Sequence, residues 1–217
     1  WASSSVERTV RRSHAGQPVA VVHEDMEGGI PMVFTGEPDL DAADALFLCM
    51  GHGNSRAWLE SHPIPAHLKI IDLSSDYRIH CFDNPFVYGL PELNREAIRK
   101  ARFIANPGCF ATGILLALLP LAAAGLLRDE IHVHAITGST GAGQQATSAT
   151  HFSWRESNLS AYKIFEHQHQ EEIMQSLLQL QPGYCNDFNL VPLRGNHTRG
   201  IFATAYTAFG GNTEAFS

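Results

Sequence analysis

The sequence has no charged side chain between Phe103 and Leu127, and this stretch limits what the chain can fold into. A membrane-spanning helix needs about twenty predominantly apolar residues. Here the stretch includes Asn106-Pro107-Gly108-Cys109 near its start and is interrupted again at Pro120, which favours a helix inside a globular domain. We expect that buried helix from Cys109 to about Leu119, extended or restarted over 120–127.

The region before this stretch alternates short apolar runs with a helical segment. Residues 44–50 and 68–74 have the composition of buried parallel strands, and a helix is expected between them from Asn54 or Ser55 to about Ser61. Strand, helix and strand in about thirty residues make a βαβ unit. Such units build doubly wound α/β sheets, in which ligands bind at the carboxyl ends of the strands.

Further elements are predicted by periodicity. Alternating polar and apolar residues predict a half-buried strand over 131–137, and apolar residues at helical spacing predict a helix over 171–180. Additional strands are expected over 18–22, 190–193 and 201–209.

Length and charge exclude some classes of protein. The 217 residues, against a typical domain of about 150, allow one large domain or two small ones. The net charge of −7 excludes the broad basic surface of a nucleic-acid-binding protein, so an anionic small-molecule substrate would need local basic residues. The four cysteines show no C-x-x-C spacing and are too few for a secreted disulfide scaffold, which favours a reducing cytoplasm.

The two ends of the chain are unusual. The first residue is Trp1 rather than Met, and neither a signal peptide nor a transit peptide fits there. The chain stops at Ser217, just after a strand-like run. We interpret the sequence as a fragment cut at both ends.

A thiol stands at the predicted strand-to-helix junction, in the tetrapeptide Asn106-Pro107-Gly108-Cys109. Backbone N–H groups and the helix dipole favour negative charge at such a position, and therefore favour the thiolate form of Cys109. This arrangement is typical of a cysteine nucleophile. From the tetrapeptide alone, a small buried hydrophobic side chain is an alternative of equal weight.

Two histidines, His167 and His169, precede a predicted helix that carries Glu172 in its first turn. Two imidazoles near one helix start can supply a general base and a residue that orients the base or the substrate. A metal site is the competing interpretation, but an i, i+2 spacing does not place two ligands on one helical face, and no further ligand is evident. Ordinary surface histidines are the third alternative.

Two loops are weaker candidates for a binding site. The run Ser139-Thr140-Gly141-Ala142-Gly143 follows a predicted strand, where a Gly-rich loop either lets the backbone approach a cofactor or serves only as a tight turn. Arg78 follows the strand that ends at Ser74, and is placed either to bind an anionic ligand or to form a surface salt bridge.

Six sequence motifs occur in one order between about residue 45 and residue 209. They are IDLSSDYR at 71–78, YGLPEL at 88–93, NPGCFAT at 106–112, GSTGAG at 138–143, YK at 162–163 with HQH at 167–169, and Pro192 with RGI at 199–201. In these motifs the chain resembles the N-acetyl-γ-glutamyl-phosphate reductases, a family of arginine-biosynthesis enzymes related in fold and mechanism to aspartate-semialdehyde dehydrogenase. Six motifs in register make the resemblance specific.

The resemblance implies an α/β fold with two incomplete domains. These are a Rossmann-type dinucleotide-binding domain over 1–108 and an α+β catalytic and dimerisation domain with a mixed sheet over 109–217. The family's glycine-rich turn, G-x-x-G-x-x-G, belongs upstream of Trp1, and its last strands and closing helix belong after Ser217. Glu171 and Phe110-Ala111 depart from the residues most usual in the family. The implied cofactor is NADP(H), and the implied partners are an acyl phosphate, inorganic phosphate and further copies in a homodimer or homotetramer, without nucleic acid, membrane or metal.

The resemblance also implies a mechanism. The Cys109 thiolate attacks the acyl carbon of N-acetyl-γ-glutamyl phosphate, phosphate leaves, and hydride from NADPH reduces the thioester to N-acetylglutamate 5-semialdehyde. His169 is expected to be the acid/base and His167 a substrate contact, with the reverse assignment open. Further substrate contacts are implied at Arg78, Tyr88, Glu92, Asn106, Arg155 and Lys163, and cofactor contacts at Ser3, Ser4, Ser5, Ser139, Gly141 and Gly143.

Two alternative functions follow from the same residues. One is the homologous reductase of lysine biosynthesis, which acts on a carrier-bound or aminoadipyl phosphate; the loop over 147–163 is where the acyl group would be distinguished. The other is an inactive remnant that serves only as an interaction domain. Cys109 together with the histidine pair argues against a remnant, whereas the absence of the glycine-rich turn argues for it.

Overall fold

The computed structural model describes residues 9–10, 14–26, 28, 31–143 and 147–208. The chain forms two compact units: residues 1–46 with 63–68, and residues 47–62 with 69–217. Ser3, Ser4 and Ser5, which were expected to contact the cofactor, lie outside the described residues. The predicted division of the chain into 1–108 and 109–217 stays a prediction.

The first unit contains little regular structure. Strand β1 (Thr9–Val10) pairs in parallel with β2 (Phe34–Thr35), and two short 3-10 helices, η2 (Val19–Val21) and η3 (Glu24–Met26), lie between them in the sequence. The strand predicted over 18–22 is therefore wrong. Val19 is buried but Val21 is 61% exposed. The described residues of this run form a β-bridge from Pro18 to Val33 but no strand, and local backbone hydrogen bonds within the run form turns instead.

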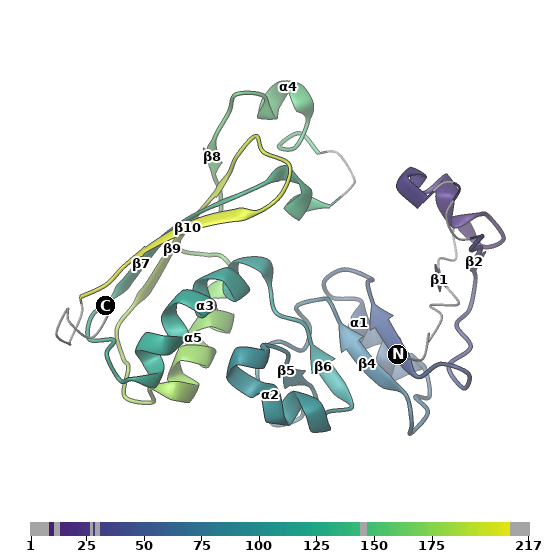
Figure 1. The fold of residues 1–217 in the computed structure, drawn as a ribbon, viewed down its shortest axis with the longest axis horizontal. Helices are drawn as coiled ribbons and strands as arrows, with labels where there is room; N and C mark the ends of the chain where they lie inside the picture. Colours follow the sequence, from purple (N-terminus) through teal and green to yellow (C-terminus); the bar gives the residue numbers. More distant parts are fainter. Residues whose placement is uncertain (1–8, 11–13, 27, 29–30, 144–146, 209–217) are drawn as a thin grey trace. The chain divides into compact units, whose positions relative to one another are not determined.

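A small parallel sheet with the order β3-β4-β6-β5 comes next (Figure 1). Its elements are β3 (Ala45–Leu48), α1 (Ser55–Ser61), β4 (Lys69–Asp72), β5 (Val87–Tyr88), α2 (Pro91–Lys100) and β6 (Phe103–Ala105). Strand β6 pairs in parallel with both β4 and β5. The predicted strand–helix–strand unit and its helix bounds are confirmed.

The second sheet is mixed and has the order β10-β7-β9-β8. Its elements are α3 (Cys109–Ala123), β7 (Ile131–Thr137), η4 (Ser139–Ala142), α4 (Phe152–Arg155), β8 (Ser160–Ala161), α5 (His169–Leu180), β9 (Phe188–Arg194) and β10 (Ile201–Tyr206). The long neighbours β7 and β9 are parallel, whereas β10 and β8 are antiparallel to them. An α/β chain with a parallel and a mixed sheet confirms the predicted fold class.

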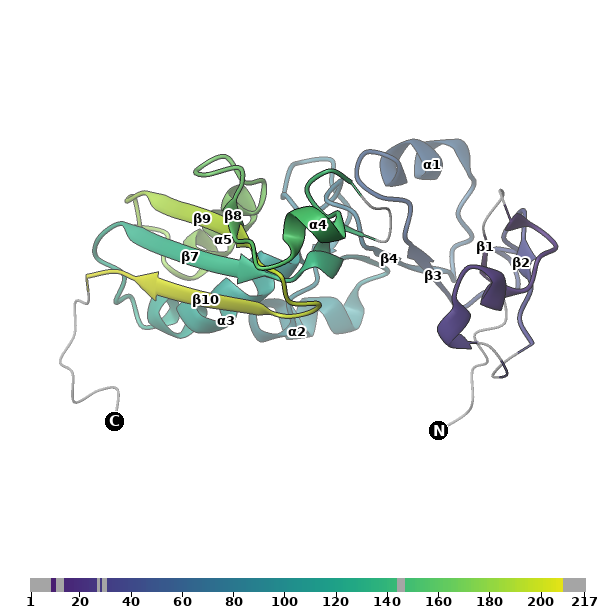
Figure 2. The same cartoon turned by 90° about the horizontal axis from the view of Figure 1, so that it is seen from above.

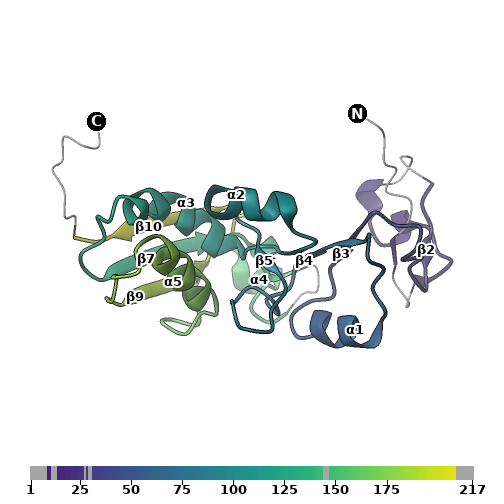
Figure 3. The same ribbon diagram turned by 90° about the horizontal axis from the view of Figure 1, so that it is seen from below.

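Helices α3 and α5 pack side by side on one face of the mixed sheet (Figures 2 and 3). The core lies between this helix pair and the sheet, and includes Ile114 and Leu118 of α3, Ile173 of α5 and Val133 of β7. The charge-free stretch is thus a core helix, as predicted. Among the described residues, no helix is both long and apolar enough to cross a membrane.

Helix α3 continues past Pro120 rather than restarting there. Pro120 has no N–H to donate to the carbonyl of Leu116. Both residues are exposed, so water can satisfy that carbonyl and the helix runs on to Ala123.

Candidate active site

Cys109 is the first residue of α3 and follows β6 through a three-residue turn. Its side chain is exposed, whereas Pro107 and Gly108 before it and Phe110 after it are buried. The alternative that Cys109 is a small buried hydrophobic residue is therefore wrong. The turn presents a thiol at the start of a helix whose other side chains are largely in the core.

Glu172, in the first turn of α5, is the centre of the polar network next to this thiol. Its carboxylate is 2% exposed and accepts hydrogen bonds from the Gly108 backbone N–H at 2.6 Å and from the Tyr88 hydroxyl at 2.8 Å. The other oxygen, Oε2, lies 3.4 Å from a terminal nitrogen of Arg78 and 3.9 Å from Nε2 of His169. Glu172 was predicted at the helix start without a role, because its partners come from distant segments.

His167 and His169 lie close to each other, with ring centres 4.6 Å apart, and both are 6% exposed. The alternative of ordinary surface histidines is therefore wrong. Burial lowers the pKa of His167 to about 4, with a smaller contribution from Lys163. Burial also lowers the pKa of His169 to about 3, assisted by electrostatic contributions from His167 and from the positive charge of Arg78. Both rings are neutral at pH 7.

The hydrogen bonds of the two rings differ. Nδ1 of His167 accepts the backbone N–H of His169 at 3.3 Å, so a neutral His167 carries its proton on Nε2. Nδ1 of His169 is buried and has no hydrogen-bond partner. A buried polar atom without a partner is uncommon and marks a position where a ligand or water is expected.

Gly108 is required by this packing. A Cβ atom built at Gly108 would overlap Nε2 of His169 and would lie 2.6 Å from Cε1 of the same ring and 2.7 Å from a terminal nitrogen of Arg78. Any larger residue before Cys109 would push the imidazole and the guanidinium away from the turn.

Arg78 is 6% exposed, and protein atoms already accept its hydrogen bonds. Its Nε donates to the carbonyl of Asn106 at 2.8 Å and its second terminal nitrogen to the carbonyl of Leu73 at 3.0 Å. Together with the Glu172 contact, this joins the ends of β4 and β6 to helix α5. The alternative of a surface salt bridge is therefore wrong, because the ion pair is buried.

The loop that carries Arg78 is held by a chain of carboxylate contacts. Buried Asp72 accepts hydrogen bonds from the hydroxyls of Ser55 and Ser74, both at 2.6 Å. Asp76 in turn accepts the backbone N–H of Gly53 at 2.6 Å and that of Arg56 at 3.2 Å, at the start of α1. These contacts explain why the 71–78 motif contains acidic and hydroxyl residues: their side chains form the hydrogen bonds that hold the loop.

Most of the other predicted substrate residues lie at or near this network. Tyr88 is buried, and Asn106 is exposed with its carbonyl bonded to Arg78. Arg155 is 4% exposed and donates to the carbonyls of Ala149 and Arg194 and to the hydroxyl of Ser160. It therefore holds the 149–160 loop against β9.

Lys163 and Glu92 are the two predicted substrate residues with exposed side chains that carry charge. Nζ of Lys163 donates to Gln168 at 2.9 Å, and the Lys163 charge contributes to the lowered pKa of both histidines. Glu92 is exposed in the first turn of α2. No described contact joins Glu92 to the network around Cys109.

The expected cofactor loop, Ser139–Gly143, contains the short helix η4 (Ser139–Ala142), and its backbone is held by a neighbouring loop. The N–H groups of Ser139 and Thr140 donate to the carbonyls of His197 and Thr198. A Cβ at Gly138 would lie 2.7 Å from the Thr198 carbonyl oxygen, and one at Gly141 would lie 3.3 Å from Oγ1 of Thr137. The protein's own packing therefore explains these two glycines.

Arg194 and Tyr162 complete the surroundings of the histidines. The guanidinium carbon of Arg194 lies 4.7 Å from the centre of the Tyr162 ring, and the Tyr162 ring lies 5.8 Å from the ring of His167. Arg194 was not among the site residues predicted from the sequence. The alternation of buried residues along β9 is the sequence pattern that could have indicated Arg194, because it places this residue on the buried face of the strand.

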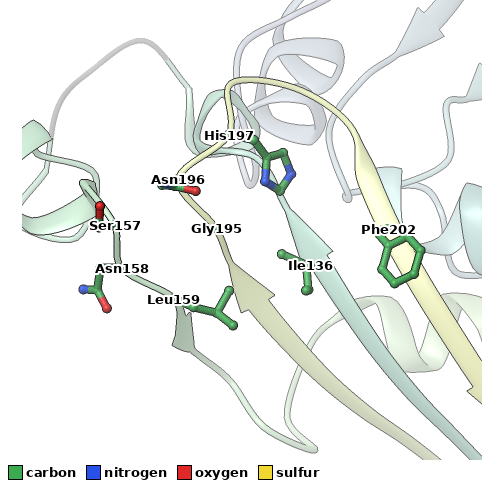
Figure 4. A pocket seen from close by; sticks show the side chains of 8 residues that line it. All are labelled: Ile136, Ser157, Asn158, Leu159, Gly195, Asn196, His197 and Phe202. Carbon is green, nitrogen blue, oxygen red and sulfur yellow. The ribbon is translucent and has the colours of Figure 1, made fainter.

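A separate pocket of about 510 Å³ opens on the other face of the mixed sheet (Figure 4). It is lined by Ile136, Ser157, Asn158, Leu159, Gly195, Asn196, His197 and Phe202. Ile136 and Phe202 face each other across β7 and β10 and alternate with the residues that face the helices. None of the predicted site residues lines it. Among the described residues, no group of three or more His, Cys, Asp or Glu is placed to hold a metal ion.

Sequence comparisons match nearly the whole chain. Residues 3–101 match the family model described as semialdehyde dehydrogenase, NAD binding domain, and residues 109–216 match semialdehyde dehydrogenase, dimerisation domain. The chain is 52% identical over 202 residues to a protein of Christiangramia forsetii named N-acetyl-gamma-glutamyl-phosphate reductase, covering 93% of this chain and 63% of that protein. A protein of the same name from Parabacteroides distasonis is 55% identical over 194 residues, covering 89% and 60%. The chain thus spans about three fifths of the length of these relatives.

Solved structures of low sequence identity share the fold. Aspartate semialdehyde dehydrogenase II from Vibrio cholerae matches with a TM-score of 0.63 at 19% identity, covering 85% of this chain and 62% of that one. The Candida albicans aspartate semialdehyde dehydrogenase with NADP matches with a TM-score of 0.62 at 12% identity, covering 96% and 65%. With the two family models and the close relatives, these matches give one conclusion: the chain belongs to the semialdehyde dehydrogenase family.

Proposed function

We propose that the enzyme containing this chain catalyses the NADPH-dependent reduction of N-acetyl-γ-glutamyl phosphate to N-acetylglutamate 5-semialdehyde, a step of arginine biosynthesis. The observation that carries the proposal is an exposed thiol, Cys109, at the start of α3 and next to a buried network that contains two neutral imidazoles. The names of relatives at 52% and 55% identity support the choice of acyl group.

The first chemical step is acyl transfer to sulfur. The Cys109 thiolate forms a C–S bond to the acyl carbon, the C–O bond to the phosphoryl group breaks, and inorganic phosphate leaves with the electron pair of that bond. The exposed position of Cys109 leaves room for the acyl group, and the fixed turn at Gly108 holds the sulfur in place. The product of this step is a thioester on Cys109.

The two imidazoles have separate roles in the proposal. His169 exchanges the proton, because its low pKa keeps the ring neutral and its Nδ1 is buried without a partner. Arg78 can only donate to Nε2 of His169, at 3.4 Å, so the neutral ring carries its proton on Nδ1. His167 contacts the substrate, because its Nε2–H is available as a hydrogen-bond donor to a carbonyl oxygen while Nδ1 is occupied. Lys163 is the exposed cation near both rings.

The cofactor is NADP(H), as the match of residues 3–101 to a NAD binding domain supports. The described residues do not fit a pyrophosphate by themselves. The start of α1 already binds the Asp76 carboxylate, and Glu172 occupies the N–H of Gly108 at the start of α3. The N–H groups of Gly53, Arg56 and Gly108 are therefore not available to a phosphate.

Replacement of Cys109 tests the reaction. In the intact enzyme, Cys109→Ser should abolish the NADP⁺- and phosphate-dependent oxidation of N-acetylglutamate 5-semialdehyde, because a hydroxyl is a far weaker nucleophile than a thiolate. Cys81→Ser changes another exposed cysteine and should leave the rate unchanged. Normal turnover by Cys109→Ser would refute the proposal.

The same assay tests the acyl group. Activity with the aminoadipate analogue and none with N-acetylglutamate 5-semialdehyde would assign the chain to the lysine-biosynthesis reaction. Comparison of His169→Asn with His167→Asn separates the two histidine roles: the first should lower kcat more, and the second should raise KM more.

We further propose a homodimer or homotetramer in the cytoplasm, with residues 109–217 making the contacts between copies. The match of residues 109–216 to a dimerisation domain supports the assembly, and the change of family model between residues 101 and 109 supports the domain boundary near 108. Four unpaired cysteines support a reducing compartment. Light scattering of the purified enzyme measures the number of copies.

A further inference from the structure

The turn between β3 and α1 is bonded to the loop that carries Arg78. His52 lies in this turn with its side chain exposed, and its Nδ1 accepts the backbone N–H of Ser75, which follows β4, at 3.0 Å. A ring nitrogen accepts an N–H only while it carries no proton, so this bond requires a neutral imidazole with its hydrogen on Nε2. The bond therefore joins the ends of two neighbouring strands only in one protonation state of His52.

The Ser75 peptide group connects the His52 ring to Arg78. The Ser75 carbonyl accepts the Arg78 backbone N–H at 3.3 Å, so a single residue lies between the ring and the Arg78 backbone. A terminal nitrogen of Arg78 donates to Nε2 of His169 at 3.4 Å and lies 3.4 Å from Oε2 of Glu172. Hydrogen bonds therefore lead from His52 to the polar network of the candidate active site.

A second set of contacts holds the same loop without an imidazole. Asp76 accepts the N–H groups of Gly53 at 2.6 Å and of Arg56 at 3.2 Å, and the Arg56 guanidinium donates to the Asp76 carbonyl at 3.0 Å. These contacts keep the loop attached to α1 when the His52 bond is absent. Loss of the His52 bond should therefore shift Ser75 and Arg78 without unfolding the loop.

The charged and titratable groups near the His52 ring come from three elements. Asp76 follows β4, Arg56 lies on α1 and His169 begins α5. Burial opposes ionisation of Asp76, but hydrogen bonds from the Gly53 and Arg56 N–H groups hold its pKa below the usual range. Burial lowers the pKa of His169 to about 3, with a smaller contribution from His52. These groups therefore keep their charge between about pH 5.5 and about pH 7.5, a range in which imidazole side chains titrate.

We propose that His52 is a positioning residue for the reaction, and that protonation of its ring releases Ser75 and lets Arg78 shift away from His169 and Glu172. The imidazolium has an N–H on both ring nitrogens and cannot accept the Ser75 N–H. His52 acts through Arg78 and does not touch the substrate. The effect on turnover rests on the proposed function, whereas the release of Ser75 does not.

Two substitutions of His52 separate the hydrogen bond from the proton. His52→Asn places an acceptor oxygen as many bonds from Cβ as Nδ1 is, and an amide does not titrate. At about pH 7.5 it should have the kcat of the unchanged enzyme. His52→Ala has no acceptor and should lower kcat roughly two- to tenfold, the effect of one hydrogen bond, with a smaller change in KM.

The relation between the enzymes should change in acid. At about pH 5.5 the ring of the unchanged enzyme is protonated, so His52→Asn should be faster than the unchanged enzyme by roughly two- to tenfold. The ratio of the two kcat values cancels the titration of every group that both enzymes share. His80→Asn changes an exposed histidine of the loop after Arg78 and should follow the unchanged enzyme at both pH values.

Two kinetic results would overturn the proposal. One is a ratio of the unchanged enzyme to His52→Asn that is the same at both pH values. The other is a His52→Ala variant with the kcat of the unchanged enzyme at the higher pH.

Hydrogen exchange of the intact enzyme, followed by mass spectrometry, tests the release of Ser75 without turnover. After correction for the intrinsic effect of pH, the peptide that spans Ser75 to Arg78 should exchange faster at about pH 5.5 than at about pH 7.5 in the unchanged enzyme and equally in His52→Asn. An enzyme without reductase activity would refute the proposed function, whereas this difference would still support the role of His52.

Corrected exchange that does not change with pH in the unchanged enzyme would overturn the proposal, whatever the variants do. Thermal unfolding identifies a variant that has not folded. If His52→Ala does not fold, the comparison of the unchanged enzyme with His52→Asn carries the kinetic test.

Discussion

The carboxylate of Glu172 accepts a hydrogen bond from the backbone N–H of Gly108, the residue before Cys109, at 2.6 Å. This bond ties the first turn of α5 to the turn that begins α3, across more than sixty positions of the chain. Because the same carboxylate also accepts the Tyr88 hydroxyl and pairs with Arg78, one buried side chain fixes the position of the thiol relative to the histidines. The predictions below test that network and the segments around it.

Removal of the Glu172 charge should reduce catalysis more than substrate affinity. Glu172→Gln keeps an acceptor for Gly108 but loses the ion pair with Arg78, so we expect kcat to fall roughly ten- to a hundredfold as the turn shifts, with a smaller change in KM. Steady-state kinetics of the intact enzyme measure both. Glu172→Asp should restore part of kcat.

The neighbouring residue provides the control for this prediction. Glu171→Gln makes the same chemical change at an exposed position of α5 and should leave kcat unchanged. Equal kinetics for Glu172→Gln and Glu171→Gln would contradict a positioning role. Glu172→Ala, which leaves Arg78 buried without its partner, should lower the free energy of unfolding by about 3–5 kcal/mol.

Two glycines near the start of α3 should respond to alanine in opposite directions. At Gly108 a Cβ would overlap the His169 ring and approach Arg78, so Gly108→Ala should destabilise the enzyme by about 1–3 kcal/mol and reduce its activity. At Gly113 a Cβ meets nothing within 4 Å, so Gly113→Ala should stabilise the helix by about 0.5–1 kcal/mol. Urea unfolding of both variants checks the sign of each change.

Acid should destabilise the folded chain through the two histidines. Their pKa values fall from 6.5 to about 4 for His167 and about 3 for His169, so the unfolded chain binds more protons below pH 6.5. The stabilisation from these groups is complete above pH 6.5 and is lost progressively as the pH falls from 6.5 through the folded pKa values of about 4 and about 3. Urea midpoints measured at about pH 7.5 and about pH 5 compare the two conditions.

A variant without one of the buried rings should lose part of this pH dependence. His167→Gln should give a smaller difference between the two midpoints than the unchanged enzyme gives. His80→Gln alters a histidine whose side chain is exposed and should leave the difference as it was. An unchanged difference in His167→Gln would show that this ring does not contribute.

The loop before Arg78 should depend on the Asp76 carboxylate. Asp76→Ala removes the acceptor for two backbone N–H groups at the start of α1, and should lower the free energy of unfolding by about 1 kcal/mol, the usual value of a helix N-cap. Asp83→Ala, at an exposed position of the loop after Arg78, should have little effect. Thermal unfolding of the two variants provides the comparison.

The alternating elements of the chain were predictable because local pattern determined them. The strand at 131–137 shows the alternation of a half-buried strand, and the helix at 55–61 follows Asn54, one of the two residues predicted to begin it, so both appear where they were predicted. The run at 18–22 was mistaken for a strand because apolar composition does not guarantee a pairing partner. Helix α3 likewise passed Pro120 because the lost hydrogen bond lies on its exposed side.

The candidate nucleophile could be located from sequence for the same reason. A cysteine directly after Asn-Pro-Gly at a strand-to-helix junction is a local pattern, and the structure places Cys109 at the first position of α3 with its side chain exposed. The histidine pair was found by its proximity in sequence to a helix start, where the structure also places it.

The burial of the arginines and the acceptors of their hydrogen bonds were decided only by the tertiary structure. Arg78 and Arg155 read in the sequence as cations available to an anion, but the fold buries both and directs their donors at backbone carbonyls. No sequence pattern distinguished Arg194, yet its Nε is buried without a partner beside Tyr162.

By itself, the sequence determined the α/β class, the helix that begins at Cys109 and the motif order that identifies the family, since each depends on neighbouring residues. The tertiary structure decided that Glu172 joins Gly108, Tyr88 and Arg78, and which arginine keeps an open donor. The physical reason is that hydrogen-bond satisfaction and burial depend on groups brought together from distant parts of the chain, and spacing along the sequence does not record those distances.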